Sequence, residues 1–157
     1  MSAPLALEAD GRGALTLGGA RYLLIRPETL VGLQKAVEQA LGERAASCIL
    51  AGGRAGGARA AASLEGSAED RVRRLLRLGG EIGWGEFALE RLTATELAVS
   101  VRRSPVAESY GPSAAPVCHL IRGVLESLAT ARWGRPAAAT ETACVAMGAP
   151  VCRFVVS

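Results

Sequence analysis

Three cysteines and one glutamate near the C-terminus are the residues of this chain whose types and spacing could do chemistry. Glu141, Cys144 and Cys152 lie within one short stretch, and Cys118 precedes them in the segment Ala-Pro-Val-Cys-His. Thiolates and carboxylates are ligands that zinc accepts in a tetrahedral shell of four. Buried cysteines are also common as small hydrophobic residues. The spacing alone therefore leaves both a zinc site and ordinary core packing open.

The two cysteines that come first along the chain have different expected surroundings. A helix is predicted over residues 116–133, and Cys118 lies in its first turn, where unpaired backbone N–H groups lower a thiol pKa. Cys48 falls in a helix predicted from residue 43 to about residue 64, on an apolar face without a partner cysteine. We therefore predict that Cys118 is a metal ligand and that Cys48 is part of the core.

The other two cysteines flank a turn between two predicted strands, at residues 137–146 and 151–156. A hairpin would bring Cys144 and Cys152 together. Glu141 precedes Cys144 by three residues, an odd offset that places the two side chains on opposite faces of a regular strand. A bulge or an irregular strand end is therefore required between them. If all four side chains bind zinc, no position remains for water, and the site is structural.

The elements that must position these residues follow from periodicity and from turn and capping signals. We predict a strand or hairpin over residues 14–25, helices over 27–41, 43–64 and 67–79, alternating strands near 87–91 and 97–101, and a loop over 104–116. With the last helix and two strands, this inventory is α+β: helices packed on a twisted antiparallel sheet of about four strands. We divide the chain into a flexible N-terminus, residues 1–12, and a single domain, residues 13–157.

A glycine-rich stretch, Ala-Gly-Gly-Arg-Ala-Gly-Gly-Ala, lies inside the second predicted helix. It lacks the Gly-Lys-Ser/Thr ending of a phosphate-binding loop, and no strand leads into it. Gly52 and Gly56, like Gly53 and Gly57, lie one helical turn apart. We predict a small-residue face against which another backbone packs closely.

Composition and charge narrow the function classes. The net charge is +3, and the densest basic run, residues 71–77, is flanked by acidic residues and has no interleaved aromatic side chains, which favours a solvated helix face over nucleic-acid binding. No apolar stretch has the length of a signal peptide core or a membrane span, so we expect a cytoplasmic protein with reduced thiols. His119 is the only histidine, and no dinucleotide-binding motif is present, so the sequence favours a binding protein over an enzyme.

Several of these residues form a recognisable pattern. It consists of Pro116-Val-Cys, Gly123, Gly134-Arg-Pro, Glu141-x-x-Cys-x-x-Met-Gly and Cys152-Arg. The pattern resembles the 4-vinyl reductase domain family. That family includes sensor domains of phenol- and xylene-responsive transcription activators, a bacteriochlorophyll-pathway protein once credited with vinyl reduction, and archaeal stand-alone members.

The resemblance implies a fold related to transport-protein-particle subunits, a homodimer, and structural zinc bound by Cys118, Glu141, Cys144 and Cys152. It also implies a pocket beside the zinc for a phenol or a similar apolar ring. This chain departs from the sensors where they carry a pocket tryptophan, since Val99 or Val101 stands there. The candidate lining residues are Tyr22, Trp84, Phe87, Val99, Val101, His119 and Ala139, of which the large aromatic ones serve equally well as anchors of an alanine-rich core.

Three functions follow as hypotheses. The first is a zinc-stabilised, non-catalytic binding module or sensor for a small apolar, aromatic or tetrapyrrole-like ligand. The second is a tetrapyrrole-pathway vinyl reductase or its accessory carrier. The third is a dimeric protein-interaction scaffold without a ligand.

Overall fold

The structure is a computed structural model that describes residues 6–157. Its helices are α1 (Pro27–Leu41), α2 (Ala45–Ala62), α3 (Ala68–Glu81), α4 (Pro105–Tyr110) and α5 (His119–Trp133), with short 3₁₀ turns η1 (Gly42–Arg44) and η2 (Val145–Met147). Its strands are β1 (Leu7–Ala9), β2 (Leu15–Leu17), β3 (Ala20–Tyr22), β4 (Glu86–Leu92), β5 (Leu97–Arg102), β6 (Ala139–Ala143) and β7 (Cys152–Val156). None of the helices in this part of the chain combines the length and the apolar character needed to cross a bilayer.

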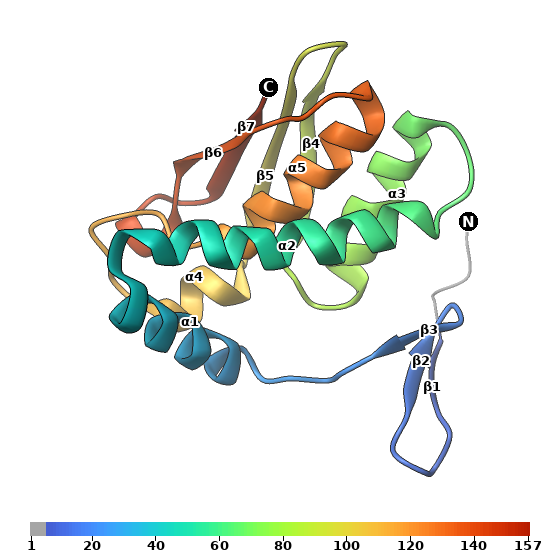
Figure 1. Ribbon diagram of the computed structural model, residues 1–157, viewed down its shortest axis with the longest axis horizontal. Helices are drawn as coiled ribbons and strands as arrows, with labels where there is room; N and C mark the ends of the chain where they lie inside the picture. Colours follow the sequence, from blue (N-terminus) through green and yellow to red (C-terminus); the bar gives the residue numbers. More distant parts are fainter. Residues whose placement is uncertain (1–5) are drawn as a thin grey trace.

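The main sheet has the strand order β4-β5-β7-β6, and each neighbouring pair is antiparallel. Helix α5 lies against one face of this sheet, α3 packs beside β4, and α2 crosses over α5 as an outer layer (Figure 1). The predicted α+β fold is confirmed. The core fills the space between sheet and helices, and its fully buried side chains include Leu97, Val99, Phe154 and Leu125.

A second, three-stranded sheet forms from residues 7–22, in the order β1-β2-β3. The predicted hairpin corresponds to β2 and β3, whereas β1 is an element that the sequence did not predict. Residues 1–5 of the N-terminal segment lie outside the described residues, and the division of the chain at residue 12 stays a prediction. This sheet stands apart from the main body and is joined to α1 by an extended segment (Figure 1).

The glycine-rich face of α2 packs closely on α5, as predicted for one of the two glycine pairs. A Cβ atom added to Gly53 would collide with the backbone at Leu120, and one added to Gly57 would lie 2.8 Å from the Cα of Val124. On the facing helix, Gly123 is equally tight against α2. Gly56 has open space around it, so only the Gly53 side of the helix requires glycine.

Two substitutions one residue apart test this close approach. We expect Gly57→Ala to destabilise the protein by about 1–3 kcal/mol, because the new methyl group overpacks against backbone that cannot move independently. Gly56→Ala adds the same methyl group to the exposed face and is expected to stabilise the helix by about 0.5–1 kcal/mol. Chemical denaturation of both variants measures the difference, and equal effects would contradict the packing role of Gly57.

Two expectations about local structure are wrong. Cys48 is exposed rather than buried, because α2 turns Leu50, Gly53 and Gly57 inward and leaves Cys48 on the opposite side of the helix. The segment 104–116 is not all loop, because α4 forms at its start. Ser104 caps this helix by accepting a hydrogen bond from the Ala107 N–H, and a proline occupies the first helical position.

Candidate metal centre

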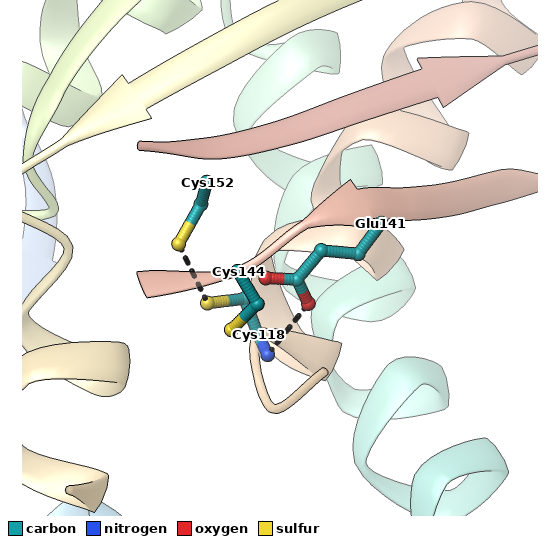
Figure 2. Close-up of side chains that lie close together, drawn as sticks. All are labelled: Cys118, Glu141, Cys144 and Cys152. Carbon is teal, nitrogen blue, oxygen red and sulfur yellow. Dashed lines mark hydrogen bonds between the residues drawn. The ribbon is translucent and has the colours of Figure 1, made fainter. Parts of the chain in front are cut away.

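The structure brings Cys118, Glu141, Cys144 and Cys152 together in one buried cluster. Their three sulfur atoms and a carboxylate oxygen all lie within 4.8 Å of one another. Figure 2 shows the side chains arriving from separate parts of the backbone with their ligand atoms directed toward a common centre. The most exposed of the four, Glu141, is only 6% exposed. These residues lie 34 positions apart at their extremes, so the fold, not local sequence, assembles the cluster.

Each ligand position comes from the end or the irregular part of an element. Cys118 is the N-cap residue of α5, one residue before the predicted first turn, and Cys152 is the first residue of β7. Along β6, Glu141 pairs with Phe154 while Ala143 pairs with Arg153, so the register shifts by one residue between them. This is the irregularity that the odd spacing of Glu141 and Cys144 requires.

Backbone and hydroxyl groups hold the ligand atoms in place. The Cys118 N–H donates a hydrogen bond of 3.0 Å to Oε2 of Glu141, and the Val145 N–H donates one of 3.4 Å to the sulfur of Cys152. The fully buried hydroxyl of Ser104 lies 3.5 Å from the sulfur of Cys118. The sulfurs of Cys118 and Cys152 are 3.7 Å apart, and both cysteines are free thiols.

The remaining carboxylate oxygen supplies a test of whether a cation fits here. Oε1 of Glu141 is buried, and nothing in the described part of the chain hydrogen-bonds it. A buried polar atom without a partner costs about 1–3 kcal/mol. A metal ion at the centre of the cluster would satisfy this oxygen together with the three sulfurs. Three soft thiolates and a single carboxylate form a donor set that suits zinc.

Without a cation, the cluster holds protons unusually. Burial raises the pKa of Glu141 to about 9, and the neighbouring Cys144 thiol adds to the effect. The pKa of Cys118 is raised well above its ordinary value, chiefly by the adjacent sulfurs of Cys144 and Cys152 and also by burial. The Cys118 thiol in turn lowers the pKa of Cys144 to about 4 and lowers that of Cys152. A bound dication would favour the charged form of all four groups.

The residues predicted to line a ligand pocket do not gather around this cluster as one set. Val99 and Val101 are fully buried inside β5. Phe87 is the cross-strand partner of Val101, and its ring packs against Gly79 of α3. Trp84, half-buried in the α3–β4 connection, joins the same core. Within this structure, these aromatic side chains act as core anchors.

The other three candidate lining residues are dispersed. Tyr22 lies on β3, in the sheet that stands apart from the main body (Figure 1). His119 follows Cys118 and is half-buried, with Nδ1 3.3 Å from Nη1 of Arg122. Burial, followed by the charge of that arginine, lowers the pKa of His119. Ala139 is buried at the start of β6.

A surface groove of about 380 Å³ lies elsewhere, between α2 and α5 and beside the start of α3. Its floor is formed by small residues that include Ala58, Ala61 and Ala131. Arg54 crosses it to pair with Glu126, which is 3% exposed. Oε1 of this glutamate accepts the Ala139 N–H at 2.8 Å, so the ion pair ties α2 and α5 to β6.

Sequence reasoning missed the buried polar residues that support the cluster. These are Ser104, Glu126 and Gln34. Ser104 precedes a proline, which is a helix-start signal. Gln34 shares a helical face with Leu30, one turn before it. A polar residue within such an apolar face was the available signal.

A family model, that of the 4-vinyl reductase domain, matches residues 97–157. This segment runs from β5 to the C-terminus and contains all four residues of the cluster. The resemblance to the 4-vinyl reductase domain family is confirmed. A search among curated proteins found no significant match to the chain.

Solved structures with the same fold extend the likeness upstream of this segment. The phenol-responsive sensory domain of the transcription activator PoxR, crystallised with phenol, matches with a TM-score of 0.83 and 23% identity over 96% of this chain and 83% of that one. A vinyl-4-reductase family protein from Methanocaldococcus jannaschii matches with a TM-score of 0.59 and 14% identity over 82% and 76% of the two chains. A trafficking protein particle complex subunit 3 from Naegleria fowleri, covalently bound to palmitic acid, matches with a TM-score of 0.59 and 13% identity over 83% and 93%.

Proposed function

We propose that the protein is a zinc-stabilised, non-catalytic binding module for a small apolar ligand. The observation that carries the metal part is the buried convergence of three thiols and a carboxylate whose Oε1 atom has no other partner in the described residues. Zinc held by Cys118, Glu141, Cys144 and Cys152 would have a complete shell of four protein ligands. Such a shell stabilises a fold and leaves no coordination position for a substrate.

The position of the cluster explains what zinc would contribute. Cys118 begins α5, Glu141 belongs to β6, and Cys152 begins β7, so one ion would cross-link a helix and two strands. Metal-binding free energy then becomes folding free energy. The chain's own contribution is to bury the site and to supply N–H donors at Cys118 and Val145 that stabilise charged ligands.

The ligand part of the proposal is supported by the fold that this chain shares with the PoxR sensory domain. That domain was crystallised with phenol, so a phenol or a similar small aromatic ring is the first ligand class to test. The buried Val99 and Val101 take little room compared with aromatic side chains. Release of core packing around these valines is the route by which this fold would admit a ring.

A native mass spectrum of protein purified without added metal tests the proposal most directly. We expect one zinc ion per chain, and a further mass increase on addition of phenol or of a larger aromatic compound. Folded protein without any metal would contradict the zinc site. Bound zinc without uptake of any aromatic probe would contradict the ligand-binding role and leave the metal site intact.

A second candidate function is a homodimeric interaction scaffold, and the N-terminal sheet favours it. Its strands have three residues each, and a sheet of this size gains little stability unless it packs against something. The segment that follows exposes Leu23 and Leu24, which are 81% and 80% exposed, and Leu33 of α1 is 63% exposed. A second copy of the chain, covering this apolar surface, would bury it. The same native spectrum would then show two chains and two zinc ions.

A further inference from the structure

A polar network connects α1 to the candidate metal centre. Gln34 of α1 is 3% exposed, although most of its neighbours on this helix are half-buried or exposed. Its Nε2 atom donates two hydrogen bonds of 2.9 Å, one to the carbonyl oxygen of Val117 and one to Oε1 of Glu38. Burying an amide is unfavourable unless it is hydrogen-bonded, so these two bonds hold the side chain in one orientation.

The bond to Val117 matters because of the peptide group to which it belongs. The carbonyl of Val117 and the N–H of Cys118 are the two ends of one planar peptide unit. Gln34 donates to its oxygen, and its N–H donates to Oε2 of Glu141 at 3.0 Å. The orientation of this single peptide group is therefore fixed by α1 on one side and by a proposed zinc ligand on the other.

The second bond of Gln34 extends the network to α4. Glu38 accepts a hydrogen bond of 2.6 Å from the hydroxyl of Tyr110, the last residue of that helix. At the other end of α4, the Ser104 hydroxyl lies against the sulfur of Cys118. Helices α1 and α4 thus hold the peptide preceding α5 from two directions. Each contact is made by a side chain that is buried or partly buried.

We infer that Gln34 is a positioning residue for the metal centre, which couples the placement of α1 to the affinity of the site for zinc. This inference rests on the proposed zinc site. Gln34 does not touch the ion; it orients the 117–118 peptide so that the Cys118 sulfur and its N–H face the cluster. Residues of this kind, which support metal ligands by hydrogen bonds, commonly change metal affinity by about 10–100-fold when replaced.

The test compares two glutamines of the same helix. Gln34→Met removes the amide but keeps the length of the side chain, and Gln39→Met makes the same change at an exposed position. Zinc affinity is measured by competition with a chromophoric chelator, and Co²⁺ substitution reports the ligand geometry through its absorption bands. We expect Gln34→Met to weaken zinc binding about 10–100-fold and to alter the Co²⁺ spectrum, with Gln39→Met unchanged.

Each other outcome has a defined meaning. Wild-type affinity and spectrum in folded Gln34→Met would overturn the inference while leaving the zinc site standing. A wild-type chain that binds no zinc would instead overturn the proposed function. If Gln34→Met does not fold, the wild-type protein provides the readout, because its side-chain amide resonances can be followed by NMR. The Gln34 resonances should shift when zinc is removed and the Gln39 resonances should not; an unmoved Gln34 signal would overturn the inference.

Discussion

Replacing Cys144 with alanine is expected to abolish stoichiometric zinc binding and to lower the free energy of unfolding by at least about 3 kcal/mol. Cys144 is 1% exposed and supplies one of the three sulfurs of the cluster. Without it, Glu141 and the two other cysteines would remain buried with an incomplete shell. The loss therefore includes the metal-binding free energy as well as the packing of one small side chain.

Cys48 provides the matched control for this experiment. The same substitution, Cys48→Ala, removes a thiol from an exposed position of α2, so its effect should stay within about 0.5 kcal/mol. Denaturant unfolding with metal analysis of both variants measures the contrast. A Cys144→Ala variant that keeps one zinc per chain would show that this sulfur is not a ligand.

The same pair of variants separates metal binding from packing. After treatment with a strong chelator, the wild-type protein loses the metal contribution but retains the Cys144 side chain in the core. The difference between wild type and Cys144→Ala should then shrink to about 1 kcal/mol, typical of a small buried group. A difference that is the same before and after chelation would identify Cys144 as a core residue only.

Much of the fold follows from local sequence signals. The Ser67 and Asp70 side chains form the predicted capping box at the start of α3. Alternation of apolar residues marks β5, and the glycines of α2 mark the close crossing with α5. In these cases the information lies within one or two helical turns or within a single strand. Local propensity and tertiary packing agree there, which makes the elements predictable.

The parts that were not predicted depend on contacts between distant segments. Cys48 lies on a helix whose small residues face α5, and the choice of that buried face depends on the partner helix rather than on hydrophobicity. For α1, the buried positions are Val31 and Gln34, whereas Leu33 is exposed. The periodic leucines predicted the helix but not which side would face the body. A surface that a second chain would cover leaves this kind of exposed leucine.

The candidate metal centre lies between these two cases. The types and spacing of Glu141, Cys144 and Cys152 predicted their convergence and the irregularity in β6 that it requires. The buried groups around them, Ser104 and Gln34, come from segments far away in the sequence. Ligand atoms carry a chemical signature that can be recognised in a sequence. Their supporting hydrogen bonds use common residue types, so only the folded arrangement reveals them.

Acidification is expected to release zinc steeply, because the metal-free cluster retains protons that the ion must displace. The pKa of Glu141 is raised from 4.5 to about 9, and that of Cys118 is raised above its ordinary value, so both are protonated near neutral pH. Cys144, with its pKa lowered to about 4, has already lost its proton. Zinc uptake should therefore release about two protons, and the affinity should rise about 100-fold per pH unit around neutrality.

The sign of the effect also indicates why zinc affinity is the quantity to measure. For the metal-free protein, the raised pKa of Glu141 makes stability fall as the pH rises from 4.5 to about 9. The lowered pKa of Cys144 makes stability rise over the range from about 4 to 9.0, so the two contributions oppose each other in unfolding experiments. In zinc binding, the protons on Glu141 and Cys118 are lost together and their effects add.

Calorimetry in two buffers of different ionisation enthalpy gives the number of protons released, and chelator competition at several pH values gives the slope. In Glu141→Gln, one of the two protons is absent while the amide oxygen can still accept the Cys118 N–H. The slope should then fall to about tenfold per pH unit, alongside a weaker affinity at every pH. A wild-type affinity that does not change with pH would mean that the thiols and the carboxylate are already ionised without metal. The raised pKa values of Glu141 and Cys118 would then be wrong, and with them the view of this cluster as a site that exchanges protons for a cation.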